Sequence, residues 1–224
     1  PEAGNLIQPF VQYPGSRYTT AGQAWREVRN NWIIPYGAAL LGITVLALAI
    51  FYLSRGALGR EPADGGGRRI ERFTPFERAA HWCDATAFVT LALSGIVMAF
   101  GKFFLQPVLG QQLFGWLAFG LKNVHNFMGP LFAVSLAVII LTFVKDNIAS
   151  RADFVWLSKA GGMFSNQEVP SHRFNAGEKG MFWWGITIPG VFVVLSGLVL
   201  DRLIPGWGLV RAEMQIAHMV HATL

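Results

Sequence analysis

The sequence of 224 residues is 53% hydrophobic and only 14% charged, whereas soluble domains carry about a quarter charged residues. This composition indicates a membrane protein. The net charge of +5 does not indicate nucleic-acid binding, because the Lys and Arg residues flank apolar runs and form no basic stripe. The single cysteine, Cys83, excludes an internal disulfide, a CxxC haem attachment site and a Cys-ligated iron–sulfur cluster within this chain.

The N-terminal third of the chain predicts one anchoring span. Residues 1–31 are polar and are expected outside the membrane, ending in a short amphipathic helix with Trp25 and Trp32 as interfacial anchors. Residues 32–53 form an apolar run long enough to cross a bilayer and without ionisable groups other than Tyr hydroxyls. Residues 54–71 are rich in Gly and Arg and predict a linker.

The second apolar run begins in the stretch RFTPFERAAHWCDATAFVTLALSGIVMAF, residues 72–100. About 20 of these residues are mostly apolar, enough for a membrane helix. His81 lies near the start of this run, close to Cys83 and Asp84. A histidine at the edge of a span is a candidate functional residue. It is interpreted either as an interfacial pair with Trp82 or as an axial haem ligand.

The remaining elements follow in order. A loop with an interfacial helix around LFGWLAFGL is expected at residues 101–124, and the third span at 125–144. A polar loop leads to the fourth span at 181–200, and a fifth apolar helix begins at 214 and stops after about a third of a span. The sequence therefore predicts an all-α integral membrane helical bundle of five spans, with a four-helix core in residues 72–224.

The basic residues predict the orientation of these spans. The linker, the start of the second span and the loop between spans three and four hold eleven of the eighteen Lys and Arg residues: Arg55, Arg60, Arg68, Arg69, Arg72, Arg78, Lys145, Arg151, Lys159, Arg173 and Lys179. The positive-inside rule therefore places the N-terminus outside and the linker in the cytoplasm.

This topology gives each histidine a depth in the membrane. His81 lies near the cytoplasmic face, and His125, His218 and His221 lie near the outer face. Two histidines on different helices at matching depth can bind a haem iron from both sides, which suits electron transfer because no coordination site stays open. His125 with His221 fits this arrangement, and His218 is the competing ligand. The alternative is that these histidines make polar contacts between helices. His172 lies in a polar loop and is expected to be an ordinary surface residue.

Several motifs occur in an order that is recognisable. RFTPFERAAHW with a following LSGI, VHNFMGP, FNAGEKGMFW with LSGLVL, and IAHMVHA together resemble the gamma subunit of membrane-bound formate dehydrogenases. That subunit is a di-haem b cytochrome related to the b-type cytochromes of nickel–iron hydrogenases. The resemblance covers residues 72–224, and FNAGEK points to the formate dehydrogenase branch.

The resemblance implies two b haems and a quinone site. It implies that His81 ligates the haem near the cytoplasmic face and that His125 and His221 ligate the haem near the outer face. It also implies a quinone site beside the inner haem, to which the turn containing Asn175 and Gly177 contributes.

This turn has a second, compatible interpretation as a helix N-cap, since Asn175 favours that position and a span follows directly. The family often has Gln where this chain has Glu178, which adds a possible negative charge near a site that takes up protons.

The implied function is electron transfer in a bacterial cytoplasmic (inner) membrane. Electrons would pass from an extracytoplasmic iron–sulfur beta subunit through the two haems to quinone, with protons taken from the cytoplasm. Formate would be oxidised on a molybdenum- or tungsten-containing catalytic alpha subunit. The alternatives are a cytochrome b subunit of a nickel–iron hydrogenase or related oxidoreductase, and a non-haem membrane anchor or proton-coupled transporter.

The ends of the sequence carry a further expectation. The chain starts at Pro1 rather than Met, so processing or preceding sequence is expected. His81 needs a partner at cytoplasmic depth, and the final helix stops at Leu224 near its outer end. The gene product is therefore expected to continue past Leu224 and to supply a histidine about four turns beyond His221, where the family resemblance places one.

Overall fold

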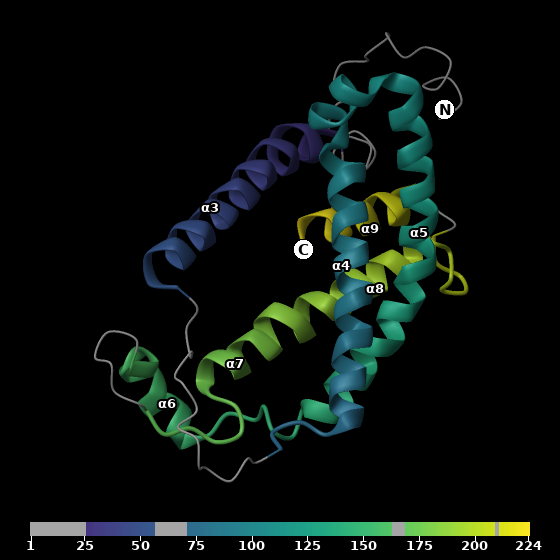
Figure 1. Cartoon of the computed structure of the whole chain (residues 1–224). Helices are drawn as coiled ribbons and strands as arrows, with labels where there is room; N and C mark the ends of the chain where they lie inside the picture. Colours follow the sequence, from purple (N-terminus) through teal and green to yellow (C-terminus); the bar gives the residue numbers. More distant parts are fainter. Residues whose placement is uncertain (1–25, 57–70, 163–168, 209–210) are drawn as a thin grey trace. The chain divides into compact units, whose positions relative to one another are not determined.

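The structure is a computed structural model in which all regular elements of the described residues are helices (Figure 1). The described parts of the chain are residues 26–56, 71–162, 169–208 and 211–224. The chain forms two compact units, a larger one of residues 63–195 and a smaller one of residues 1–62 with 196–224. The expected all-α architecture is confirmed.

Two long helices, α4 (Pro75–Phe104) and α5 (Gln106–Phe143), pack along each other in the larger unit (Figure 1). The helical path is broken near the start of α5, where Gly110 has a φ of +77°, a conformation that glycine adopts at little cost. The prediction of a loop with an interfacial helix at residues 101–124 is wrong. Beyond Gly110, this stretch is largely apolar and contains no proline, so the helix continues unbroken into the His125 span.

Individual side chains of this pair also contact α8 (Ile188–Leu200), where Val194 packs against their shared cluster. Ala87 of α4 forms a buried cluster with Phe132 and Leu136 of α5. A Cβ atom added to Gly190 of α8 would lie 2.9 Å from a methyl carbon of Leu136, so only a glycine allows this approach. Lipid tails are as apolar as these side chains, and shape complementarity therefore replaces the hydrophobic effect as the force between spans.

Four helical stretches of the described chain are long and apolar enough to span a membrane: residues 26–54, 75–104, 106–143 and 176–200. A helical membrane protein is therefore confirmed. The last helix, α9 (Arg211–Thr223), has 13 residues, fewer than the ~20 that a span requires. At the position of the expected fifth span, the described chain therefore forms a helix shorter than a full span.

The smaller unit contains the π-helix η2 (Arg29–Gly37), α3 (Ala38–Arg55), the end of α8 and α9. Apolar side chains are exposed along α3, as lipid contact requires, and this agrees with the anchoring span expected at residues 32–53. The amphipathic helix expected around Trp25 lies partly outside the described residues, and from Arg26 onward the chain belongs to the spanning helix.

Three helices of the larger unit begin with a capping box, in which the first side chain and a carboxylate three residues later satisfy each other's backbone N–H groups. The pairs are Thr74 with Glu77 for α4, Ser150 with Asp153 for α6 (Arg151–Ser158), and Asn175 with Glu178 for α7 (Ala176–Gly180). These pairs fix where each helix starts.

A buried ion pair holds α6 against α7. Lys179 Nζ lies 2.8 Å from Asp153 Oδ2 and also donates to the Ile148 carbonyl at 3.0 Å. The Lys179 and Asp153 side chains are 7% and 10% exposed. The hydrogen bond from Lys179, aided by those from Ser150, holds the pKa of Asp153 below its ordinary value. A charge buried in this way depends on its partner.

We expect Lys179→Met to loosen α6, because it leaves the Asp153 carboxylate buried without its cation. Hydrogen–deuterium exchange of the α6 amides should accelerate by about tenfold or more. Because the folded-state pKa of Asp153 is depressed, the stabilisation is present at neutral pH and is lost as the pH falls below about 4 through that pKa. The exposed residue Lys102 provides the control variant, Lys102→Met. Equal exchange in the two variants would contradict this role.

Candidate functional site

His125 is half-buried on α5 and is held by Ser94 of α4, whose Oγ lies 2.8 Å from His125 Nδ1. Ser94 is 1% exposed and directs its hydroxyl proton to the carbonyls of Thr90 and Leu91. Since a hydroxyl has one proton, Ser94 Oγ accepts the hydrogen bond from His125 Nδ1–H. This tautomer has its lone pair on Nε2, as a metal-binding imidazole requires.

Two glycines reduce the bulk around this imidazole. A Cβ atom at Gly95 would lie 3.6 Å from His125 Cε1, and a Cβ atom at Gly129, one turn after His125, would meet nothing within 4 Å. The imidazole tautomer and the space beside Gly129 fit a flat haem bound through Nε2.

His221 repeats this arrangement within the smaller unit. Ser196 Oγ lies 3.2 Å from His221 Nδ1, and a Cβ atom at Gly197 would lie 3.1 Å from His221 Cε1. His221 is half-buried on α9. His218, the competing residue, lies three positions earlier on the same helix.

Each of these histidines is thus held by the same sequence, Leu-Ser-Gly, at residues 93–95 of α4 and 195–197 of α8. In both cases the serine contacts Nδ1 and the glycine lies beside the ring edge; at Gly197 the approach is tight, and at Gly95 a Cβ atom would make an ordinary contact. Hydrogen bonding of Nδ1 is the usual way in which proteins orient a ligating imidazole.

His81 lies at a different level of α4. It is exposed, and its ring stands edge-on to Trp82 with 5.6 Å between ring centroids. At 1.5 Å per residue, Ser94 and hence His125 lie about 20 Å farther along α4 than His81. This agrees with the expected difference in depth. Asp84, one turn from His81, accepts a hydrogen bond of 2.8 Å from Ser135 of α5.

The N-cap interpretation of Asn175 is confirmed, because its Oδ1 accepts a hydrogen bond of 2.9 Å from the Glu178 N–H. Glu178 in turn accepts from the Asn175 N–H at 2.9 Å. Gly177 also has a packing role, since a Cβ atom there would lie 3.1 Å from the Trp156 indole. His172 is exposed, as expected.

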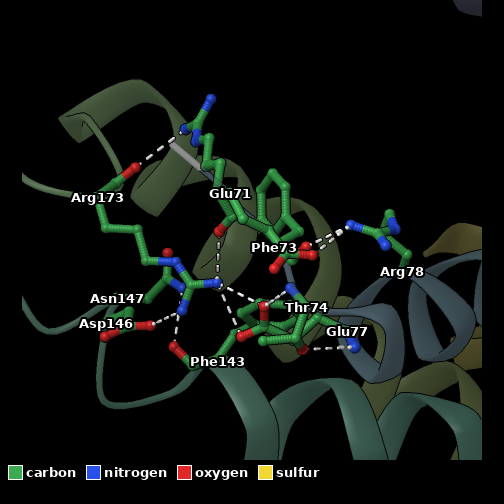
Figure 2. Close-up of polar contacts among 10 residues, drawn as sticks. Glu71, Phe73, Thr74, Glu77, Arg78, Phe143, Asp146, Asn147 and Arg173 are labelled. Carbon is green, nitrogen blue, oxygen red and sulfur yellow. Dashed lines mark hydrogen bonds and ion pairs between the residues drawn. The ribbon is translucent and has the colours of Figure 1, made fainter. Parts of the chain in front are cut away.

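Arg173 joins the start of α4 to the region just after α5 at one face of the larger unit (Figure 2). Its guanidinium lies 2.7 Å from Glu77 at the start of α4 and 2.5 Å from Asp146 after the end of α5. It also donates to the carbonyl of Arg72 at 3.0 Å. Arg72 returns the bond by donating to the Arg173 carbonyl and to Glu178 of α7. We call these five residues the arginine clamp.

Aromatic rings surround the charge at the centre of the clamp. The rings of Phe73, Phe143 and Phe174 lie with their centroids 5.4–5.7 Å from Arg173 Cζ, a distance at which cation–π attraction operates. The hydrogen bond to Glu77 raises the pKa of Arg173 above its already high value, so the guanidinium stays charged. The clamp shows that the start of α4, the end of α5 and the start of α7 share one face, as the predicted topology requires.

Sequence reasoning missed the serines and the clamp. The repeated Leu-Ser-Gly was noted as a family motif, and the regular position of its serine before each glycine was the available signal. Arg72 and Arg173 were interpreted as orienting charges. Arg173 lies 27 and 96 residues from Asp146 and Glu77, so no local pattern could have paired them.

Similar proteins carry cytochrome names. The chain is 31% identical over 141 residues to the cytochrome b556(Fdn) subunit of the nitrate-inducible formate dehydrogenase of Escherichia coli K12, covering 60% of this chain and 61% of that protein. It is 28% identical over 135 residues to the cytochrome b556(fdo) subunit of formate dehydrogenase from the same strain, covering 59% and 61%. The chain thus matches less than two thirds of the length of these relatives.

The family called prokaryotic cytochrome b561 matches residues 72–224. The matched region contains the arginine clamp and both Leu-Ser-Gly motifs with their histidines. It also begins at the first described residues before α4, after the linker, where the four-helix core was expected to begin. Because the match extends over more than half of the sequence, the chain belongs to the prokaryotic cytochrome b561 family.

Proposed function

We propose that this chain is the membrane cytochrome b subunit of a formate dehydrogenase in a bacterial inner membrane. It receives electrons from an iron–sulfur beta subunit and passes them through two b haems to quinone, while a molybdenum- or tungsten-containing alpha subunit oxidises formate. The names of the relatives support formate as the source of electrons rather than hydrogen. The four apolar helices support the location in a membrane.

The repeated serine–histidine contact carries the haem assignment. His125 and His221 are the proposed ligands of the outer haem, and in each case a serine orients Nδ1. When bound, haem b supplies reversible one-electron chemistry, and the protein supplies ligation, orientation and burial. Ligation by two imidazoles leaves no position for oxygen or substrate, as an electron carrier requires.

The second haem and the quinone are assigned to the face that carries the arginine clamp. His81 is the proposed ligand there, about 20 Å along α4 from the level of His125. Asn175 and Gly177 are proposed to border the quinone site because α7 starts at this same face. Glu178 forms an ion pair with Arg72 and caps α7. Its charge therefore stabilises the turn and is not an unpaired charge at the proposed quinone site.

Affinity purification of the membrane complex, followed by mass spectrometry of its subunits, tests the assignment to formate dehydrogenase. Co-purification of a molybdenum- or tungsten-containing subunit and an iron–sulfur subunit would support it. Co-purification with a nickel–iron hydrogenase would overturn the choice of electron donor. Isolation without haem would favour a transporter or anchor.

We expect His125→Ala to lose the outer haem, because it removes one of two axial ligands. Pyridine haemochrome analysis of the purified complex should show about half of the wild-type haem b. His218→Ala is the matched control and should keep the full amount. Full haem content in His125→Ala, or loss in His218→Ala with retention in His221→Ala, would contradict the assignment.

Ser94→Ala should keep the haem and shift its midpoint potential upward. The hydrogen bond from Nδ1–H makes the imidazole a stronger electron donor, which favours oxidised iron. Loss of one neutral hydrogen bond, worth ~1 kcal/mol, corresponds to a shift of at most about 40 mV for one electron. Thr90→Ala, one turn away on the same helix, where the hydroxyl donates to the Thr86 carbonyl, should leave the potential unchanged. An unchanged potential in Ser94→Ala argues against the tautomer assigned here.

Asn175 variants separate capping from quinone binding. Asn175→Asp and Asn175→Ser keep a good N-cap, whereas Asn175→Ala costs about 1 kcal/mol of helix stability. If the amide N–H₂ group binds quinone, all three variants should slow quinone reduction and spare dye-coupled formate oxidation. Wild-type quinone reduction in the Asp and Ser variants, with loss only in the Ala variant, would show a role limited to capping.

A further inference from the structure

Helix α6 buries its acidic residue and exposes apolar side chains. Asp153 is buried, whereas Phe154 is 71% and Leu157 is 58% exposed. Because they are three positions apart, Phe154 and Leu157 lie next to each other on one face of the helix. A surface helix of a soluble protein has the opposite pattern, with apolar residues toward the protein and charges toward water.

Contacts on the inner side fix α6 at the level where two spans end. Asp153 binds Lys179 of α7, and Lys179 also binds the Ile148 carbonyl just after α5. The Trp156 indole packs against Gly161 and Gly177, two positions where a side chain would collide with it. Since α5 ends and the fourth span begins at the same face, α6 is held at the boundary between the membrane and water.

Basic side chains accompany the apolar stripe. Lys145, Arg151 and Lys159 are all exposed and lie just before α6, at its first residue and just after its last. Long basic side chains at this depth extend toward lipid phosphate groups while their alkyl stems stay in apolar surroundings.

The exposed apolar surface continues onto the neighbouring spans of the same unit. Leu141 near the end of α5 is 77% exposed, and Trp184 in η4 (Met181–Thr187) is 77% exposed. These residues belong to helices long and apolar enough to span a membrane, so lipid is the expected neighbour of their outward faces.

We propose that α6 is an interfacial membrane helix, with Phe154 and Leu157 inserted among lipid acyl chains and with Lys145, Arg151 and Lys159 at the phosphate groups. The geometry matches that of helices lying in the plane of a bilayer, whose apolar face is buried about 5–10 Å below the headgroups. The Asp153–Lys179 pair then holds the helix in this orientation from the protein side.

Nitroxide scanning of the complete complex in phospholipid vesicles tests this proposal. In a Cys83→Ala background, which removes the chain's single cysteine, spin labels are attached to Phe154→Cys, Leu157→Cys and the control Ser171→Cys. Ser171 is exposed and lies in the polar loop between α6 and α7. Power saturation compares collisions with oxygen, which concentrates in lipid, and with a water-soluble nickel chelate.

Labels at positions 154 and 157 should collide mainly with oxygen, and the label at 171 mainly with the nickel chelate. Strong nickel collisions at all three positions would place α6 in water and overturn the proposal. Weak collisions with both reagents at positions 154 and 157 would show that a protein partner covers this face, and would also overturn it. Two independent stripe positions keep the test decisive if one label perturbs the helix.

Discussion

Arg173 places one guanidinium between the carboxylates of Glu77 and Asp146, which come from the start of α4 and the end of α5. Inside a bilayer the hydrophobic effect cannot draw these helices together, because lipid solvates their apolar surfaces as well as protein does. The clamp supplies a directional attraction at the membrane face, and close contacts such as Leu136 with Gly190 supply shape complementarity within it. With the helix ends fixed, residues farther along α4 and α5 meet in a defined register.

The most consequential result of that register is the contact between Ser94 and His125. A buried imidazole needs a hydrogen-bond partner, because an unsatisfied polar group is costly in an apolar medium. Ser94 satisfies Nδ1 and so determines which nitrogen can bind a metal. Ser196 Oγ contacts Nδ1 of His221 in the corresponding way. In each case one serine thus contacts Nδ1 and would also orient the proposed haem ligand.

The sequence could predict the apolar spans because a run of apolar residues makes a membrane helix wherever it occurs. It could also single out the histidines as candidate site residues, because their positions at the ends of these runs can be read directly. The same reasoning failed at residues 101–124, where the expected loop is instead the end of α4 and the first part of α5. It recognised Asn175 as a cap, since capping acts within one helical turn. It could not pair Arg173 with Glu77 or Ser94 with His125, because those contacts depend on tertiary register between distant segments. The inverted polarity of α6 is likewise visible only once Lys179 is seen to draw Asp153 inward.

The central claim, that this chain carries electrons from formate through b haems, is tested most directly by an optical difference spectrum. Formate is added anaerobically to the purified, oxidised complex, and dithionite is added afterwards to reduce all remaining haem. We predict that formate alone produces the sharp alpha band of reduced low-spin haem b and that dithionite adds little to it. An alpha band that appears only with dithionite would contradict formate as the electron source, and the absence of a band with either reductant would contradict the haem assignment itself.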